Sequence, residues 1–258
     1  MRLVTLNVRN TADRWAERRS LLARQLAALA PDVVALQELR TWPDQARWIV
    51  EAVERGSGGR LRYAVHRRPK AGPWGLWEGL AVLTRIPVAA TASVGLGSHA
   101  RVAQRVTVRV PGGGFLDVYN THLAPAGETV RRAQAARLLA WVDARRPAVV
   151  AGDFNARPGS PTIELLSRRL RSAHAEVHGA EPARTVPTPL RGATATGGGS
   201  VLDYVFVSDG VDVLDARVVF DEVDAADPTL AASDHFGVSA TLAVTGCCSP
   251  ASPDRRRR

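Results

Sequence analysis

Cysteine, lysine and long apolar segments are all scarce in this 258-residue sequence. The two cysteines, Cys247 and Cys248, are adjacent, lack the spacing of a metal site, and could bridge each other only with strain. No apolar run is long enough to span a bilayer. The opening MRLVTLNVRN alternates like a strand and lacks the apolar core of a signal peptide. We therefore expect a cytoplasmic protein without disulfides or stable membrane association.

Basic residues are almost all arginine. Lys70 is the single lysine among 34 basic residues, and 25 acidic residues leave a formal net charge of +9. A basic surface favours polyanionic partners through counterion release and electrostatic steering. The abundance of arginine and alanine is typical of GC-rich coding, so no single arginine identifies a function. The closing RRRR belongs to a segment, 247–258, that we predict to be a disordered basic tail.

Helical and strand patterns alternate along the chain without an internal repeat. The strands after the Pro/Gly-rich segment 181–200 cannot form a core alone, so we predict one α/β domain over 1–246. Apolar spacing predicts helices at 13–29, 43–55, 128–144 and 161–171. It predicts strands at 2–8, 32–39, 62–66, 79–84, 88–94, 102–110, 115–122, 148–154, 201–207, 213–220 and 238–244.

The segment AVVAGDFN, residues 148–155, is an apolar strand that ends in an acid and an amide. A buried strand cannot hold an unpaired carboxylate, so Asp153 must lie where the strand leaves its sheet. Side chains alternate along a strand, so Asp153 and Asn155 point the same way, opposite to Phe154. A simple turn explains this pattern equally well. Whether Asp153 and Asn155 form a simple turn or a functional site depends on which residues lie at the ends of the neighbouring strands.

Other apolar strands also begin or end in acids, amides and histidines. If these strands share a sheet, their polar ends converge on one rim. Carboxylate and amide oxygens are ligands that Mg²⁺ prefers, and an imidazole beside an acid is a general base or a phosphate donor. The candidate residues are Asn7, Glu38, His122, Asp153, Asn155, Asp203, Asp234 and His235.

Seven motifs in a fixed order resemble one known family. TLNVRN, LQE, GLAVLTRIPV, NTHL, GDFNA, LDYVFVS and SDHFGV, spread over residues 1 to about 244, are similar to those of the endonuclease/exonuclease/phosphatase superfamily. That superfamily includes pancreatic deoxyribonuclease, exonuclease III, neutral sphingomyelinases and inositol polyphosphate 5-phosphatases. The resemblance implies a four-layer α/β sandwich, in which two packed mixed sheets are flanked by helices. It places the site at one end of the sheets.

The resemblance also implies a divalent metal site. Asn7 and Glu38 match the metal-site asparagine and glutamate of the family, and Asp234 matches a further metal-site acid. The expected ion is Mg²⁺, with Mn²⁺ as an alternative, and the number of ions is open.

The catalytic roles implied by the resemblance fall on five residues. Asp153 matches the acid that orients or deprotonates the attacking water, and Asn155 matches an amide that holds phosphate or metal. His235 matches the catalytic histidine, oriented by Asp203. His122 matches a histidine that donates to the phosphate.

Two nearby residues are less clearly placed. Exonuclease III and the AP endonucleases use a tyrosine in the region of His122, but Tyr119 is out of register for that role. Glu78 resembles the acid that partners this histidine in the deoxyribonuclease branch, although a solvent-facing glutamate fits the sequence nearly as well.

Three functions are compatible with these motifs. The positive charge and the basic, aromatic segment 67–79, which contains Trp74 and Trp77, favour a nuclease acting on DNA or RNA. Loop 184–191 is a second candidate for substrate contact. The alternatives are a phosphoesterase acting on phospholipid headgroups, inositol phosphates or other small phosphates, and an inactive binding module. We expect a monomer, with His66, His99, His174 and His178 on the surface and Trp15, Trp48 and Trp141 in the core.

Overall fold

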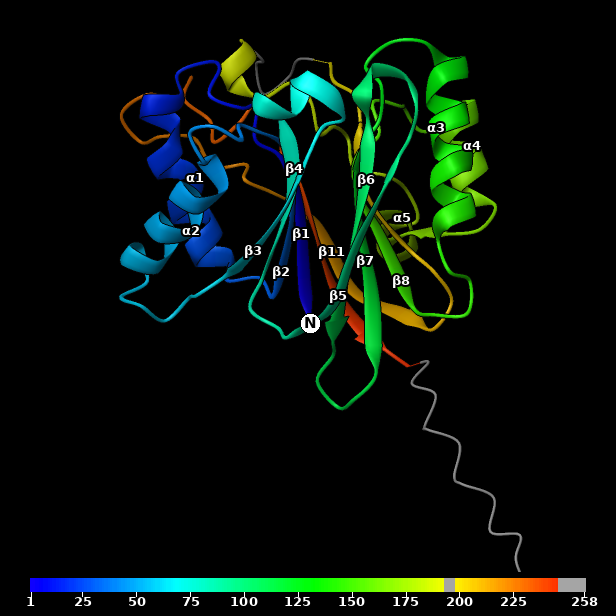
Figure 1. Cartoon of the computed structure of the whole chain (residues 1–258). Coiled ribbons are helices and arrows are strands. Elements are labelled where there is room, and N and C mark those ends of the chain that lie inside the picture. The colour runs from blue at the N-terminus through cyan, green and yellow to red at the C-terminus, as the bar shows by residue number, and fades with distance from the viewer. Residues whose placement is uncertain (193–197, 246–258) are drawn as a thin grey trace, which may run out of the picture.

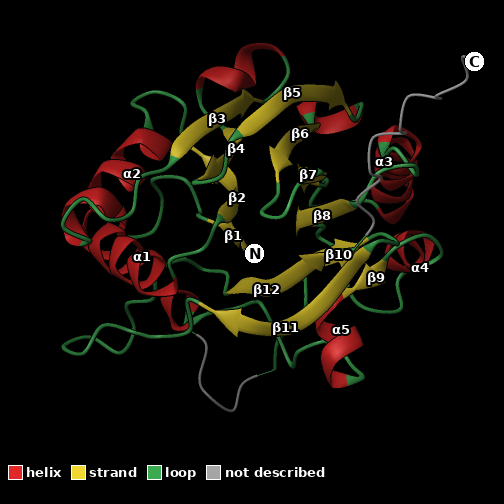
Figure 2. Cartoon of the chain, turned by 90° about the horizontal axis from the view of Figure 1, so that it is seen from below, coloured by secondary structure: helices red, strands yellow, loops and turns green. Residues whose placement is uncertain are grey.

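Two six-stranded sheets pack face to face, and helices cover the outer side of each (Figure 1). A computed structural model describes residues 1–192 and 198–245 of the chain. The predicted tail, with Cys247 and Cys248, lies outside the described residues. Seen from below in Figure 2, α1 and α2 flank the first sheet, and α3 and α4 flank the second. This arrangement confirms the predicted four-layer sandwich.

The elements follow the expected alternation of strands and helices. The first sheet has the order β11 (Val211–Val219), β12 (Gly237–Val244), β1 (Arg2–Asn7), β2 (Val33–Leu39), β4 (Gly79–Thr84), β3 (Ala64–Pro69). The second has the order β5 (Val88–Gly95), β6 (Val102–Arg109), β7 (Phe115–His122), β8 (Ala148–Asp153), β10 (Asp203–Val207), β9 (Arg171–Ser172). The helices are α1 (Trp15–Leu29), α2 (Gln45–Gly56), α3 (Glu128–Trp141), α4 (Pro161–Ser167) and α5 (Ala173–His178). Short 3-10 segments are η1 (Gly72–Leu76), η2 (Ser98–Ala100) and η3 (Pro189–Arg191).

Each sheet contains one parallel pair of strands joined by a helix. In the first sheet β1 runs parallel to β2 through α1, and in the second β7 runs parallel to β8 through α3. Parallel strands end at the same edge of a sheet, so Asn7 lies opposite Gln37 and His122 lies opposite Asp153. Antiparallel β10 begins beside the end of β8, with Asp203 opposite Asp153. Strand order therefore gathers polar chain segments at one end of the sandwich.

Three groups of buried apolar residues fill the three interfaces between the four layers. Along β1, Leu3 lies between the sheets, whereas Val4 packs under α1 and α2. Along β8, Val149 lies between the sheets and Val150 faces α3. Successive side chains of a strand point to opposite faces. Odd-numbered residues of both strands therefore point into the space between the sheets.

The structure differs from the predicted elements mainly near residue 170. The predicted helix 161–171 ends at Ser167, and a two-residue strand and the short helix α5 follow it. Ser160 begins α4 by accepting a hydrogen bond from the backbone of Ile163, as expected of a helix cap. Within the ranges 1–192 and 198–245, none of the helices has the length and apolar character needed to cross a membrane.

Candidate active site

Strand alternation turns four of the candidate side chains toward the space between the sheets. Asn7 has the same parity as Leu3 in β1, and Asp153 has the same parity as Val149 in β8. His122 and Asp203 follow the inward parity of β7 and β10 in the same way. All four are at most 3% exposed, because they lie at the buried rim of the inter-sheet core. In each of these strands the side chain at the end that lies at the rim is polar and faces the space between the sheets.

Glu38 reaches the rim through a break in its strand. Leu36 faces α1 and α2, so regular alternation would turn Glu38 the same way. The pairing of β2 with β4 shifts register between Leu36 and Leu39, and Glu38 has a positive φ of 52°. Such a bulge re-aims a side chain. Glu38 consequently accepts a hydrogen bond from Asn7 Nδ2 at 3.2 Å.

Asp153 lies at the centre of the cluster. Its Oδ2 accepts a hydrogen bond from Asn7 Nδ2 at 3.0 Å, and its Oδ1 accepts one from the backbone of Asn155 at 2.8 Å. The Nε2 atoms of His122 and His235 lie 3.4 and 3.9 Å from the same Oδ2. Burial, with repulsion from a neighbouring carboxylate, raises the pKa of Asp153 to about 7. This carboxyl group therefore exchanges protons near neutral pH.

His235 and Asp203 form a hydrogen-bonded pair beside Asp153. His235 Nδ1 lies 2.9 Å from Asp203 Oδ2, which fixes the ring and leaves Nε2 facing Asp153. Burial alone would lower the pKa of His235, but the carboxylates of Asp203, Asp153 and Asp234 outweigh it and raise the pKa to about 10. The imidazolium is therefore the stable form of this ring at neutral pH.

His122 and Asn155 hold each other on the other side of Asp153. Asn155 Nδ2 lies 3.1 Å from His122 Nε2 and also donates to the carbonyl of Leu123 at 3.1 Å. Burial, followed by the positive charges of Arg101 and Lys70, holds the pKa of His122 well below its usual value. The neutral ring accepts from the Asn155 amide through Nε2, so its proton sits on Nδ1.

Asp234 and Arg9 border the cluster on the solvent side. Arg9 Nε lies 3.4 Å from Asp234 Oδ2 and 2.9 Å from Asp13 Oδ2. The backbone amide of Arg9 also donates to Asn7 Oδ1 at 2.9 Å. Asp234 is thus brought to the rim, where it forms an ion pair with Arg9.

Arg18, which lies in none of the sequence motifs, holds two of these segments together. Its guanidinium is fully buried and donates to the carbonyls of Val8 at 2.9 Å and Ala232 at 3.0 Å. Val8 follows Asn7 and Ala232 precedes Asp234. The remaining donors bind the carbonyls of residues 9, 10, 12 and 13. The amphipathic pattern of α1 puts Arg18 on the inner face of the helix, and this pattern is the feature of the sequence that indicates its burial.

Glu78 and two cations lie next to His122. Glu78 forms an ion pair with Lys70, and Arg101 NH1 lies 3.5 Å from its Oε1. These three residues line a small cavity together with His122, whose Nδ1 is buried without a hydrogen-bond partner in the described part of the chain. No hydrogen bond between Glu78 and His122 is present among those residues, so the pairing suggested by sequence stays a prediction.

The donor set of the cluster suits a divalent cation. Carboxylate oxygens of Asp153 and Asp203 lie within 4.8 Å of each other, and Asp203 Oδ1 is buried without a partner among the described residues. Burial, followed by repulsion from Glu78, also raises the pKa of Glu38. Closely spaced buried carboxylates are stable in the charged form only beside a cation. The residues therefore fit a hard, oxygen-binding metal ion.

Loop 184–191 supports the cluster from behind. Thr185 Oγ1 accepts from the backbone amide of Asp203 at 3.3 Å, and Thr188 Oγ1 donates to the carbonyl of Ser233 at 2.6 Å. Both threonines are fully buried. The loop thus connects the segments that carry Asp203 and Asp234, and its predicted contact with substrate stays a prediction.

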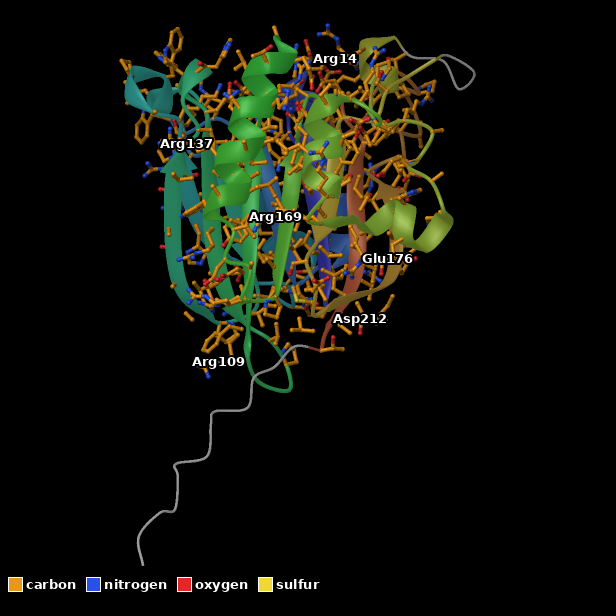
Figure 3. The ribbon with its side chains drawn as sticks, turned by 90° about the vertical axis from the view of Figure 1, so that its right-hand side faces the viewer. Arg14, Arg109, Arg137, Arg169, Glu176 and Asp212 are labelled. Atoms are coloured by element: carbon orange, nitrogen blue, oxygen red, sulfur yellow. The ribbon has the colours of Figure 1, made fainter. Side chains whose placement is uncertain are left out.

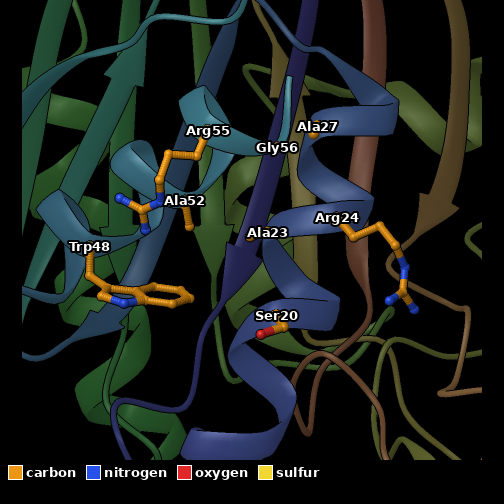
Figure 4. Close-up of a pocket in the computed structure, with 8 residues that line it drawn as sticks. All are labelled: Ser20, Ala23, Arg24, Ala27, Trp48, Ala52, Arg55 and Gly56. Carbon is orange, nitrogen blue, oxygen red and sulfur yellow. The ribbon is translucent and has the colours of Figure 1, made fainter. Parts of the chain in front are cut away.

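Features away from the cluster have other roles. A groove of about 370 Å³ between α1 and α2 has an alanine floor with Trp48 at one end, and none of the candidate residues lines it (Figure 4). Trp15, Trp48 and Trp141 are half-buried and pack against the core groups. His99 and His178 are exposed, while His66 and His174 are half-buried and outside the cluster.

Solved structures with this fold come from several organisms. The catalytic domain of human Nocturnin, solved with a bound sulfate anion, has 23% identity and a TM-score of 0.75 over 95% of this chain and 93% of its own. A humanized TDP2 of D. rerio has 17% identity and a TM-score of 0.72 over 95% of this chain and 99% of its own. A mannosyl-6-phosphatase of Bacteroides thetaiotaomicron has 18% identity and a TM-score of 0.72 over 94% of this chain and 99% of its own. Identities this low show a shared fold alone.

Sequence comparison gives the family directly. No curated protein matches the chain. The model of the endonuclease/exonuclease/phosphatase family matches residues 4–235, which include every candidate residue. The chain therefore belongs to the endonuclease/exonuclease/phosphatase family, whose members are metal-dependent hydrolases of phosphoester bonds.

Proposed function

We propose that the protein is a Mg²⁺-dependent phosphodiesterase that cleaves nucleic acid at the rim of the two sheets. One observation carries the proposal. Asp153 Oδ2 has Asn7 Nδ2, His122 Nε2 and His235 Nε2 within 4 Å, and Asp203 orients His235 at 2.9 Å. A carboxylate between oriented imidazoles is suited to moving a proton at a phosphate ester.

Asp153 is the proposed proton acceptor. A general base works best when its pKa lies near the working pH, and burial has raised the pKa of Asp153 to about 7. The attacking water would form a bond to phosphorus, give its proton to Asp153, and displace the ester oxygen on the opposite side. Asn7 holds Asp153 in place through its amide.

His235 is the proposed hydrogen-bond donor to the phosphoryl oxygens or to the leaving oxygen. Its raised pKa keeps it protonated, and Asp203 fixes Nδ1, so Nε2 is the donor that remains. Negative charge grows on these oxygens as the ester bond breaks, and a fixed donor stabilises it more than water does. His122 and Asn155 border the same space and are the proposed contacts to a further phosphate oxygen, which would replace the hydrogen bond that they make to each other.

Glu38, Asn7 and Asp234 are the residues proposed to hold Mg²⁺, with Mn²⁺ as a substitute. A bound divalent ion neutralises phosphate charge and polarises the phosphorus–oxygen bond. The arrangement supporting this choice is the hydrogen bond of Asn7 to Glu38 together with the position of Asp234 at the rim.

Nucleic acid is the proposed substrate because the formal net charge is +9 and polyanions bind basic surfaces. The test is hydrolysis of plasmid, single-stranded DNA, RNA, sphingomyelin, a sugar phosphate and bis(p-nitrophenyl) phosphate in Mg²⁺, Mn²⁺ or excess chelator. We expect nucleic acid to be cleaved, and chelator to abolish cleavage. Faster hydrolysis of sphingomyelin or the sugar phosphate would assign the alternative substrate class.

Two variants make the test specific to the proposed site. Glu38→Gln should raise the Mg²⁺ concentration needed for half-maximal rate, because it removes one charged ligand. Asp212→Asn is the matched control, since Asp212 is exposed on β11 at the opposite end of the molecule (Figure 3). A metal titration of Glu38→Gln that superimposes on those of the parent and Asp212→Asn would exclude Glu38 as a ligand.

A further inference from the structure

Three tryptophans and a leucine gather in the exposed turns beside the candidate active site. We name Trp42, Trp74, Leu76 and Trp77 the tryptophan rim; they are 77%, 66%, 65% and 56% exposed, respectively. Buried cores normally take up such side chains, so an exposed group of them indicates a binding surface. Figure 1 shows η1, which carries Trp74 and Leu76, next to the start of β4, at the end of the sandwich where β1 ends.

Hydrogen bonds fix the tryptophan rim to the segments that carry the site. Asn10 Nδ2 donates to the carbonyl of Trp77 at 3.0 Å, and Thr41 Oγ1 donates to the carbonyl of Gly75 at 2.7 Å. Asn10 lies three residues after Asn7, and Thr41 lies three residues after Glu38. Leu39 of β2 pairs with Gly79 of β4, which sets the turn that carries Trp77 beside the end of the strand that carries Glu38. A substrate bound in the site would therefore pass this surface.

Arg40 gives the ring of Trp77 a fixed position. The guanidinium carbon lies over the ring, 5.6 Å from its centroid. Arg40 is itself anchored by donating to the carbonyl of Trp42 at 2.8 Å and to Thr11 Oγ1 at 3.3 Å. Trp77 is still more than half exposed. A flat ring supported from one side by a guanidinium is suited to stacking another flat ring on it.

Cations near the tryptophan rim are mostly paired with acids, which limits their use for binding phosphates. A long duplex is bound largely through unpaired arginines and lysines that contact its backbone. The paired cations of this region are Arg9 with Asp13 and Asp234, Arg67 with Asp44, Lys70 with Glu78, and Arg191 with Asp13. At this end of the molecule, exposed aromatic side chains therefore offer more surface for binding a substrate than unpaired cations do.

We propose that the tryptophan rim stacks the unpaired bases of a single-stranded nucleic acid while its backbone enters the site. This rests on the proposed function and names its substrate class. Bases in a duplex are already stacked on each other, so only unpaired bases offer free faces to Trp74 and Trp77. A membrane is a poorer fit, because Arg40, Asn10 and the Lys70–Glu78 pair interrupt the apolar surface.

The test uses a single-stranded oligothymidylate, the same-length backbone without bases, and a duplex of equal length. Trp77→Ala should lower kcat/KM on the oligothymidylate roughly tenfold, mainly through KM, which corresponds to about 1.4 kcal/mol of stacking. Trp77→Phe should retain most of the activity. Neither variant should change cleavage of the base-free backbone, and the parent should favour the single strand over the duplex.

The matched control is Phe115→Ala, since Phe115 also stacks under an arginine, Arg109, at 5.2 Å. Phe115 begins β7 and His122 ends it, so this control lies at the opposite end of the sandwich. It should leave all three substrates unaffected. Equal losses of Trp77→Ala on the oligothymidylate and on the base-free backbone would overturn the proposal, as would a parent preference for duplex that Trp77→Ala preserves.

Binding separates this inference from the proposed function. Tryptophan fluorescence of the Asp153→Asn variant in chelator should be quenched by oligothymidylate, and Trp77→Ala in that background should weaken the binding roughly tenfold. A parent that cleaves no nucleic acid would refute the proposed function while this measurement still reports on stacking. Absence of quenching, or Trp77-dependent sedimentation with phosphatidylcholine–phosphatidylserine vesicles in its place, would refute the stacking proposal.

Discussion

His235 Nδ1 lies 2.9 Å from Asp203 Oδ2, and this contact joins the two sheets. Asp203 begins β10 in the second sheet, and His235 precedes β12 in the first. The orientation of the imidazole therefore depends on how the sheets pack, and not on a local turn.

We predict that His235→Ala lowers kcat by at least about a hundredfold with a small change in KM, because it removes a donor to the charged transition state. Asp203→Asn should lower kcat by a smaller factor, and the double variant should be little worse than His235→Ala, since the two residues act as one unit. Steady-state kinetics on the cleaved substrate measures this.

The control for that series is His99→Asn, because His99 is exposed and has a positive φ of 61° that asparagine tolerates. Its kcat should equal that of the parent. Retention of more than half the parent rate by His235→Ala would show that the proposed assignment is wrong.

Asp153 should destabilise the metal-free protein as pH rises. Its pKa of about 7 in the folded protein lies above the ordinary aspartate value of 3.8, so its stabilising contribution is fully present below pH 3.8 and is lost as pH rises through about 7. In chelator, Asp153→Asn should match the parent near pH 4 and melt higher at pH 8, by roughly 2–4 °C for each kcal/mol of relieved repulsion.

Thermal melts of both proteins in chelator test this, with Asp212→Asn expected to follow the parent at both pH values. Mg²⁺ should raise the melting temperature of the parent by mass action on the folded state, and that of Asp153→Asn by less. A variant that melts below the parent at pH 8 would mean that Asp153 serves as a structural cap.

Arg18→Met should destabilise the fold by about 3–5 kcal/mol, because it leaves buried carbonyls without donors. Six carbonyls accept from this guanidinium. Arg24→Met on the same helix is the control, since Arg24 is exposed. Chemical denaturation measures both, and equal stabilities would show that the carbonyls find other partners.

Gly152→Ala should destabilise the protein by about 3 kcal/mol or more through overlap and backbone strain. A Cβ at this position would lie 2.0 Å from the carbonyl oxygen of Thr121, and φ is +149°. Gly56→Ala, whose Cβ would meet nothing within 4 Å, is the control and should be neutral or stabilising. Yield of soluble protein and melting temperature report the difference.

Local pattern was enough to predict most strands and the polar residues at their ends. Alternation in AVVAGDFN, for example, correctly set Asp153 opposite in direction to Phe154, which packs in the outer core. The same reasoning could not predict how Glu38 is aimed. Its strand parity points it toward α1, and only the shifted pairing with β4 turns it to the rim. Such a shift depends on partners distant in sequence.

Arg18 shows a second limit of the sequence. Its position on the apolar face of α1 is a local sign of burial, but nothing near it in the sequence identifies its partners. Its partners are backbone carbonyls, which every residue has, and one of them, Ala232, lies 214 residues away. The exposure of the tryptophan rim could not be predicted from the sequence either, since the segment 67–79 is equally compatible with a hairpin that folds its tryptophans onto the domain. Tertiary packing decides both cases.

The turn at 85–87 is where the chain passes from the first sheet to the second. The part of the chain before this turn carries Asn7 and Glu38, and the part after it carries Asp153, Asp203 and His235. Strand β12 of the second part returns to the first sheet and pairs with β1. Two polypeptides divided at this turn would each hold an incomplete set of reactive groups. Because the candidate residues come from both parts, hydrolysis at the proposed site requires that the two parts associate.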